Sequence, residues 1–324
     1  MLNIIISHKA DLDGVASAAL MIKKFMKNGE PFMVYMRDYE DESEVIPSEL
    51  LEIKECRVYI SDISIMLKGF DEILSRISKI DGKVLWTDHH EYRAEYSQRL
   101  KERGVDLLID PQSPAAAILV SQRYNIDDRQ SKRIVEMATQ SDSWKIREER
   151  VMDIVNIIDY YNYLEKKAER SRLVSLSYIL AQNDPDKVPT DDLMAVLEHY
   201  KKVKGKAIKR VLDSSTERVI NGLKFYFALS PSIISGTQAT DALIKSFKAD
   251  VYIVIKEDGG ISFRRGRDDI DLSKMAELFG GGGHAYAAGA SVGDRVDENR
   301  FEQLITEMGK KISTTSIYLA DTKK

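Results

Sequence analysis

The chain has 324 residues, which is long enough for two domains with separate apolar cores. Its 43% apolar and 31% charged residues are typical of a globular protein, and no apolar run approaches the ~18 residues of a membrane span. The formal net charge of −4 argues against bulk binding of long nucleic acid, but not against a small phosphorylated ligand. With one cysteine and no signal-peptide pattern, we expect a cytoplasmic protein with no membrane partner.

The first part of the chain alternates short apolar strands with amphipathic helices. Strands are predicted over residues 2–7, 32–36, 57–61 and 83–87, and helices over residues 15–27, 48–54 and 71–79. This alternation is typical of a parallel sheet with helices on both faces. In such sheets, ligands bind beyond the carboxyl ends of the strands.

The remainder of the chain changes character twice. Residues 115 to about 220 are predicted to be mostly helical, with a break over 185–192. Period-2 patterning then returns in three short segments, and a helix near 271–279 and a glycine run follow. The three segments are residues 223–229, 250–255 and 260–264.

These patterns predict an α/β protein in three parts. A parallel-sheet N-terminal domain is expected over residues 1–148, a helical connector over 149–221, and a smaller α/β C-terminal domain over 222–324. The last residues, 320–324, are expected to be frayed.

Carboxylates and imidazoles follow several of the predicted strands. The segment His8-Lys9-Ala10-Asp11-Leu12-Asp13-Gly14 comes after the first strand, Asp62 after the third, and the tripeptide Asp88-His89-His90 after the fourth. Asp142 lies in the helical part. Together they offer four carboxylates and two imidazoles as candidate metal ligands: His8, Asp11, Asp13, Asp62, His89 and Asp142.

Oxygen and imidazole ligands without a thiolate favour two Mn²⁺ ions over a structural zinc, with Mg²⁺ or Co²⁺ as substitutes. Two ions roughly 3.5–4 Å apart would lower the pKa of bound water and stabilise the charge that develops on an attacked phosphoryl group. Taken singly, an aspartate at a strand end is more often a helix cap, and adjacent histidines are usually an ordinary surface feature. The joint placement of six such residues favours the metal hypothesis.

A glycine run provides a second candidate site. We expect Gly281, Gly282 and Gly283 to open a helix, so that backbone N–H groups and the helix dipole bind an anion. His284 would add a hydrogen bond to a phosphate, and Arg264 and Arg265 on the preceding strand would add bidentate contacts. The alternative is a flexible linker or the C-terminal cap of a helix.

In combination, these motifs resemble the DHH phosphoesterase superfamily, in the branch that carries a DHH-associated C-terminal domain. That branch includes RecJ-like exonucleases and NrnA-like oligoribonucleases and phosphatases. The resemblance extends over residues 8–289 and rests on the Asp-Leu-Asp-Gly segment at 11–14, Asp62, the Asp-His-His tripeptide, Asp142 and the Gly-Gly-Gly-His segment at 281–284. It implies a di-manganese centre in the N-terminal domain and a nucleotide site in the C-terminal domain.

The resemblance also implies individual roles. His8, Asp11 and Asp62 would hold one ion. Asp13, Asp62, His89 and Asp142 would hold the other, with Asp62 as the bridge. Asp88 would orient a ligand histidine, and His90 would orient the attacking hydroxide or polarise the phosphate. Gly282, Gly283 and His284 would hold a substrate phosphate, assisted by Arg264.

We therefore expect a manganese-dependent phosphodiesterase that degrades short RNA or DNA oligonucleotides as a 3′→5′ exonuclease and releases nucleoside 5′-monophosphates. Two enzyme alternatives share this chemistry: a phosphatase for 3′-phosphoadenosine 5′-phosphate and a cyclic-dinucleotide phosphodiesterase. The non-enzyme alternative is a nucleotide-binding subunit. The helical connector is open to two interpretations, homo-oligomer formation or a wall of the substrate cleft.

Overall fold

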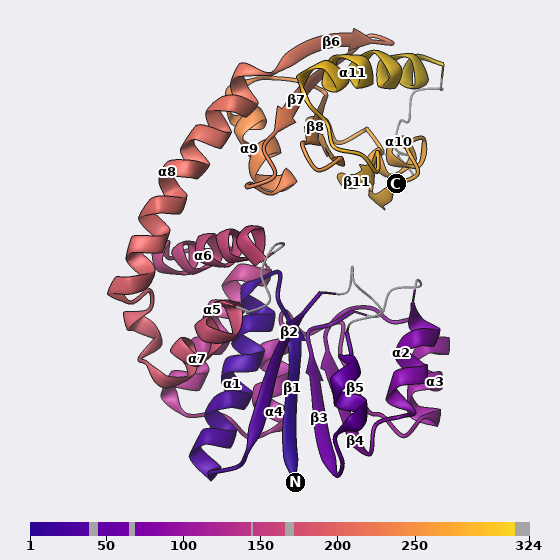
Figure 1. The fold of residues 1–324 in the computed structure, drawn as a ribbon. Coiled ribbons are helices and arrows are strands. Elements are labelled where there is room, and N and C mark those ends of the chain that lie inside the picture. The colour runs from indigo at the N-terminus through magenta and orange to yellow at the C-terminus, as the bar shows by residue number, and fades with distance from the viewer. Residues whose placement is uncertain (39–44, 65–68, 144, 166–171, 315–324) are drawn as a thin grey trace. The chain divides into compact units, whose positions relative to one another are not determined.

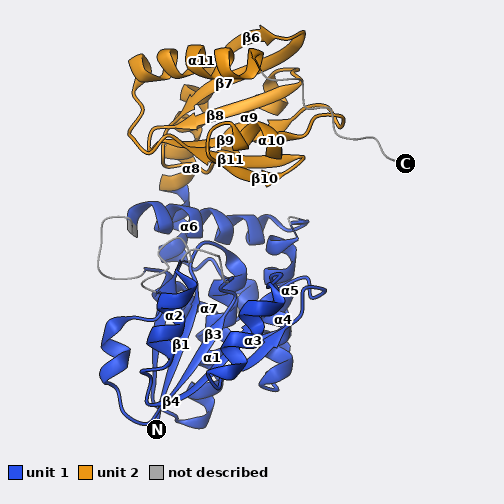
Figure 2. Ribbon diagram, turned by 90° about the vertical axis from the view of Figure 1, so that its right-hand side faces the viewer, with its two compact units in different colours: residues 1–198 blue, residues 199–324 orange. Residues whose placement is uncertain are grey.

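The protein is described here by a computed structural model that covers residues 1–38, 45–64, 69–143, 145–165 and 172–314. The chain separates into two compact units, residues 1–198 and residues 199–324 (Figure 2). The predicted connector over 149–221 is divided between them. The terminal residues 320–324, which we expected to be frayed, lie outside the described part.

A five-stranded sheet forms the centre of the first unit, and all of its neighbouring strands are parallel (Figure 1). The order is β2-β1-β3-β4-β5. The strands are β1 (Leu2–His8), β2 (Phe32–Arg37), β3 (Cys56–Ser61), β4 (Gly82–Asp88) and β5 (Asp106–Ile109). The predicted fold class, an α/β protein with a parallel N-terminal sheet, is confirmed.

Helices cover both faces of this sheet. Successive strand residues point to opposite sides, and because apolar side chains occur on both sides, both faces need to be buried. Ile5 lies in the core on one side, and Ile4 and Ile6 lie in the core on the other. The first side carries α1 (Leu12–Asn28), α4 (Ala116–Arg123), α5 (Arg129–Asp142), α6 (Glu149–Glu165) and α7 (Arg172–Gln182). The second side carries α2 (Phe70–Ile77) and α3 (Ala94–Glu102).

The second unit is built on a mixed six-stranded sheet of order β10-β11-β9-β8-β7-β6, in which only the pair β7–β8 is parallel. The strands are β6 (Thr216–Ile220), β7 (Leu223–Ser230), β8 (Val251–Lys256), β9 (Gly260–Arg265), β10 (Gly282–His284) and β11 (Ala287–Ser291). One face packs against α10 (Leu272–Glu277) and α11 (Glu298–Ser313). The other packs against α9 (Gly236–Ser246) and the end of α8 (Asp191–Asp213).

Several expected elements differ from the observed ones. Residues 48–54 do not form an α-helix, because a short 3₁₀ helix at Ser48–Glu52 follows Pro47 instead. The mostly helical region ends earlier than predicted, since residues 216–220 pair with β7 as a strand. Strands β5 and β11 were not predicted. Among the described residues, no helix combines the length and apolar character needed to cross a membrane.

Candidate metal centre and phosphate-binding surface

The turn between β1 and α1 brings His8 and Asp11 together at the carboxyl end of the sheet. Asp11 is the N-cap of α1, since its Oδ1 accepts a hydrogen bond from Gly14 N at 3.0 Å. Gly14 has no substitute here, because a Cβ atom on it would lie 2.1 Å from the His8 carbonyl oxygen. The glycine therefore lets the helix begin directly against the strand that carries the imidazole.

A first group of ligand-type atoms comes from three residues at this edge. His8 Nδ1 lies 3.2 Å from Asp11 Oδ2 and 3.6 Å from Asp62 Oδ2. Asp62 is 1% exposed and has a φ of +57°, a left-handed conformation that costs energy in a non-glycine residue. The ligating atoms of the three residues all lie within 4.8 Å of one another.

A second group surrounds His89. Its Nε2 lies 3.6 Å from Asp62 Oδ1, 3.7 Å from Asp13 Oδ2 and 3.9 Å from Asp142 Oδ2. Its Nδ1 lies 3.1 Å from the carbonyl oxygen of Ser113, which only accepts, so Nδ1 carries the proton. In the neutral ring, Nε2 therefore presents its lone pair to the carboxylates, as a metal-ligating histidine does.

Asp13 also has a structural role. Its two oxygens accept hydrogen bonds from Ala116 N at 2.6 Å and Ala117 N at 2.8 Å, at the start of α4. Its side chain thus caps that helix from outside, since the helix's own N-cap, Ala115, provides no side-chain hydrogen bond. A carboxylate oxygen has lone pairs enough to accept an N–H and bind a cation, so capping and metal binding are compatible.

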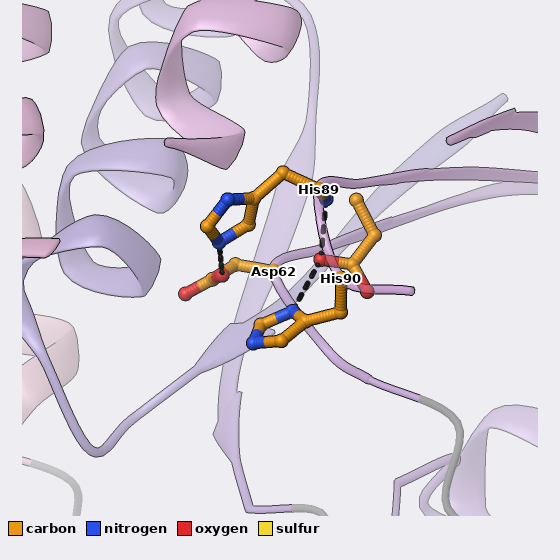
Figure 3. Close-up of side chains that lie close together, drawn as sticks. Asp62, His89 and His90 are labelled. Carbon is orange, nitrogen blue, oxygen red and sulfur yellow. Dashed lines mark hydrogen bonds and ion pairs between the residues drawn. The ribbon is translucent and has the colours of Figure 1, made fainter. Parts of the chain in front are cut away.

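Asp88 is fully buried, and both of its carboxylate oxygens form hydrogen bonds with nearby residues of the same segment. Its Oδ1 accepts from His89 N at 2.8 Å and lies 2.9 Å from His90 Nδ1, and the Tyr92 hydroxyl donates to Oδ2 at 2.8 Å. Figure 3 shows the rings of His89 and His90 on either side of Asp62. Asp88 belongs to a cluster with Asp62 and the two histidines, but its hydrogen bonds fit it to hold the histidines in place.

The electrostatics of the cluster reflect buried, crowded carboxylates. Burial and the charges of neighbouring aspartates raise the pKa of Asp13 and Asp62, and raise the pKa of Asp142 to about 6. Burial alone would lower the pKa of the two imidazoles, but the adjacent carboxylates outweigh it and raise the pKa of His8 to about 11 and of His89 to about 10. Bound protons thus offset part of the negative charge.

The residues fit a divalent cation. Within the described ranges, Asp62 Oδ2 and His89 Nε2 are buried polar atoms with no hydrogen-bond partner. A buried polar atom without a partner destabilises the fold unless a ligand or an ion binds it. The single cysteine, Cys56, lies at the opposite end of β3 and donates to the Asp81 carbonyl oxygen, so it contributes no thiolate here.

Some neighbours of the cluster were not predicted. Asp38, whose Oδ1 lies 3.9 Å from His8 Nε2, directly follows β2 and so obeys the same strand-end rule as the predicted residues. Tyr92 and the Ser113 carbonyl carry no such signal, since they act through contacts made only in the fold. The same holds for Asn162 of α6, whose Nδ2 donates to the Lys9 carbonyl oxygen at 2.9 Å.

The glycine run does not open a helix, and that expectation is wrong. Gly280 and Gly281 terminate α10, since their N–H groups donate to Glu277 O at 3.1 Å and Ala276 O at 2.9 Å. The following residues form β10, which pairs antiparallel with β11. A Cβ atom on Gly281 would lie 2.0 Å from Gly289 O, and one on Gly283 would lie 2.7 Å from Ala287 O. The glycines are required by this close approach.

Arg264 and His284 lie on the same face of the second sheet. The register pairs Arg264 with Ala287 and Ala287 with His284, so the three side chains point to one side. Arg264 is fixed by a hydrogen bond from its guanidinium to Thr237 Oγ1 at 3.0 Å. Arg265 points to the other face by strand alternation and forms an ion pair with Asp268 at 3.2 Å, so the structure does not bring it to His284.

Comparisons with known proteins identify one domain and several structures with a similar fold. The DHHA1 domain matches residues 231–314. No curated protein matches the sequence. Similar solved structures cover 98% of the chain, and at their low sequence identity the likeness shows a shared fold.

Three of these structures illustrate the likeness. A pGpG-specific phosphodiesterase, PggH, from Vibrio cholerae is 13% identical with a TM-score of 0.59, and 100% of its chain is covered. The DHH domain of a protein described as a member of a family of ribosomal proteins is 16% identical with a TM-score of 0.66, and 87% of its chain is covered. RecJ from Thermus thermophilus, in complex with Mn²⁺, is 12% identical with a TM-score of 0.64, and 53% of its chain is covered.

Proposed function

We propose that this chain is a member of the DHH phosphoesterase superfamily and a metal-dependent phosphodiesterase of short oligonucleotides. The DHHA1 match over residues 231–314 and the shared fold support the proposed family. One observation carries the proposal. Two groups of ligand-type atoms, one around His8 and one around His89, share Asp62, which lies 3.6 Å from each imidazole. A carboxylate between two such groups suits a pair of divalent ions.

Each group would hold one ion. The first would be held by His8, Asp11 and Asp62, and the second by Asp13, Asp62, His89 and Asp142. When bound, the ions lower the pKa of a water molecule and offset the charge that develops at phosphorus. We propose Mn²⁺, with Mg²⁺ or Co²⁺ as substitutes, because the donors are oxygens and imidazoles without sulfur.

The chain's own residues would orient the reacting groups. The Ser113 carbonyl holds His89 with Nε2 toward the carboxylates, and Asp88 holds His90 by its Nδ1. Burial alone would lower the pKa of His90, but Asp88 outweighs it and raises that pKa. In the resulting imidazolium form, the other ring nitrogen also carries a proton and can donate a hydrogen bond to a phosphate oxygen of the substrate. Because Asp88 is anchored on both oxygens, the tripeptide forms a rigid support for this contact.

The second unit would bind the end of the substrate. Arg264 and His284 offer a guanidinium and an imidazole on one face, as a terminal phosphate requires. The net charge of −4 favours a short substrate over a long single strand. We propose degradation from the 3′ end with release of nucleoside 5′-monophosphates.

A linear-dinucleotide phosphodiesterase is the second candidate. The observation that favours it is length, because the chain covers 100% of the pGpG-specific phosphodiesterase but 53% of the Thermus RecJ. Hydrolysis of 3′-phosphoadenosine 5′-phosphate would require the same metal chemistry and a terminal phosphate site.

The test is a product ladder. Purified protein with Mn²⁺ is incubated with 5′-labelled RNA of two, five and twelve nucleotides, and the products are separated over time. We expect stepwise shortening of the five-nucleotide RNA, and conversion of the dinucleotide alone would instead support the second candidate. If the dinucleotide and the five-nucleotide RNA both stay intact with Mn²⁺, Mg²⁺ and Co²⁺, the proposed function is wrong.

A further inference from the structure

Among the described residues, one end of the second unit's sheet is uncovered on the face that carries Arg264. Helix α9 packs on this face mainly over β8 and β9, whereas the side chains on β10 and β11 are small. In addition to His284, the positions of β10 and β11 on this side are Gly282, Ala287, Gly289 and Ser291. On β9, Ser262 faces the same side but lies against Gly236 at the start of α9. The result is a floor of glycine, alanine and serine on β10 and β11 whose residues on this side are exposed or partly exposed.

Two aromatic rings lie at the β10–β11 turn at one edge of this floor. The rings of His284 and Tyr286 are stacked, with centroids 5.3 Å apart and planes inclined by only 9°. Both residues are exposed, and Tyr286 is 57% exposed, which is unusual for a large ring. A parallel stack with an exposed outer ring is a surface on which a third flat ring can lie.

A positive charge lies at the opposite edge. Arg264 lies two strands away from His284, with the methyl group of Ala287 between them. Two strand spacings are about 9.5 Å. Thr237 holds the guanidinium in place, and Thr237 belongs to the first turn of α9, whose positive dipole end adds to the charge. A ligand that binds both edges needs an anionic group for Arg264 and a flat ring for the aromatic stack. A nucleotide has both.

We propose that the exposed face of Tyr286, backed by the stacked ring of His284, is a nucleobase platform. The base of the terminal nucleotide lies on it, while Arg264 and the ring edge of His284 bind the phosphate. The proposal rests on the proposed function, and it extends that function from phosphate binding to recognition of the base. Stacking tolerates every base, because each base has a π face. The platform therefore selects nucleotides over base-free phosphates without selecting a sequence.

The test compares 5′-AMP with ribose 5-phosphate, which carry the same phosphate but differ in the base. Binding to the full chain is measured by calorimetry in chelator, so that metal does not contribute. We expect the wild type to bind 5′-AMP about tenfold more tightly. Tyr286→Ala should remove this preference and leave ribose 5-phosphate affinity unchanged, whereas Tyr286→Phe should keep it. Arg264→Ala should weaken both ligands together.

Two controls separate the platform from a change in folding. Val219→Ala truncates another exposed apolar side chain of the same sheet, on β6, and should bind both ligands like the wild type. A dinucleotide with a terminal 2-aminopurine gives an independent signal, because stacking on an aromatic ring quenches its fluorescence. We expect quenching by the wild type and by Tyr286→Phe, but not by Tyr286→Ala.

The outcomes distinguish this proposal from the proposed function. If the wild type shows no preference for 5′-AMP, or if Tyr286→Ala keeps it, the platform is overturned, whether or not RNA is hydrolysed. If the preference depends on Tyr286 and all oligonucleotides remain intact, the platform stands as a nucleotide site and the hydrolytic function fails.

Discussion

Asp62 is the residue on which the candidate centre depends. Its carboxylate lies between the two imidazoles, at 3.6 Å from each, and its backbone adopts a left-handed conformation. Burial and neighbouring charge raise its pKa above the ordinary range. Because the folded pKa is raised, the group destabilises the metal-free fold progressively as pH rises from its unfolded value, near 3.9, through the folded one.

Asp62→Asn tests this assignment, since asparagine keeps the shape and tolerates left-handed backbone but carries no charge. At pH 7 without metal, we expect its melting temperature to be no lower than that of the wild type. The rise in melting temperature that Mn²⁺ produces should be lost, and hydrolysis should fall by more than about 100-fold. Thermal shift and the RNA assay measure the two effects.

The matched control is Asp71→Asn, an exposed aspartate in an ion pair with Arg99 outside the cluster. It should keep both the Mn²⁺ response and the activity. If Mn²⁺ raised the melting temperature of Asp62→Asn as much as that of the wild type, the proposed position of Asp62 between two ions would be wrong.

At this scale, the sequence predicts which side chains meet, but not how they are held. His8, Asp11 and Asp62 were identified because residues after parallel strands collect at one sheet edge. The roles of Tyr92 and the Ser113 carbonyl were not predictable, because each depends on a contact that spans intervening structure. The metal roles themselves remain predictions.

Helix α5 shows how a single cap joins two elements. Asp128 is its N-cap, accepting from Gln130 N and Ser131 N, and its Oδ1 also lies 2.6 Å from Lys23 Nζ of α1. Burial opposes ionisation, but the hydrogen bonds to Lys23 and Ser131 outweigh it and lower the pKa of Asp128 to about 2. A lowered folded pKa stabilises the fold above the unfolded value and loses this effect as pH falls toward 2.

Asp128→Asn keeps the cap and removes the charge. We expect it to lower the free energy of unfolding at pH 6 by no more than about 1 kcal/mol, because the carboxylate is half exposed and screened by solvent. The difference in free energy of unfolding from the wild type should disappear between pH 4 and pH 2. Urea titration at each pH measures it. A difference that persists at pH 2 would rule out the charge as its source.

The elements themselves were predictable where burial sets the pattern. The apolar runs of β1, β3 and β4 are buried on both sides and contrast with the amphipathic helices between them. Strand β6 was missed because its residues are largely exposed and its pairing with β7 is not visible locally. The glycine run was misassigned because a close backbone approach and a helix start both call for glycine.

At the scale of the whole molecule, each unit has its own apolar core. The boundary falls within α8, which contributes Leu193 and Leu197 to the core of the first unit and Ala207 and Val211 to a core of the second. The fragment 191–324 therefore contains the whole helix and everything that packs in the second unit. Its core is large enough for independent folding.

We expect the fragment 191–324 to unfold cooperatively when expressed alone and to bind 5′-AMP with the affinity of the full chain in chelator. Mn²⁺ should not raise its melting temperature, because all six predicted ligands lie in residues 1–198. Circular dichroism and calorimetry test both points. A fragment that stays unfolded would show that the second unit depends on the first for its stability.

The tight pairing of β10 with β11 has a consequence for mutational scanning of this protein. Every side chain placed at Gly281 or Gly283 would collide with the backbone of β11. In a saturation library, these positions would be depleted as strongly as a reactive residue, although the selection would act on strand geometry. Gly282 separates strand geometry from ligand contact, because a Cβ atom there meets nothing within 4 Å. Substitutions tolerated at Gly282 would indicate that geometry alone causes the depletion at Gly281 and Gly283. Depletion at Gly282 as well would indicate contact with a ligand.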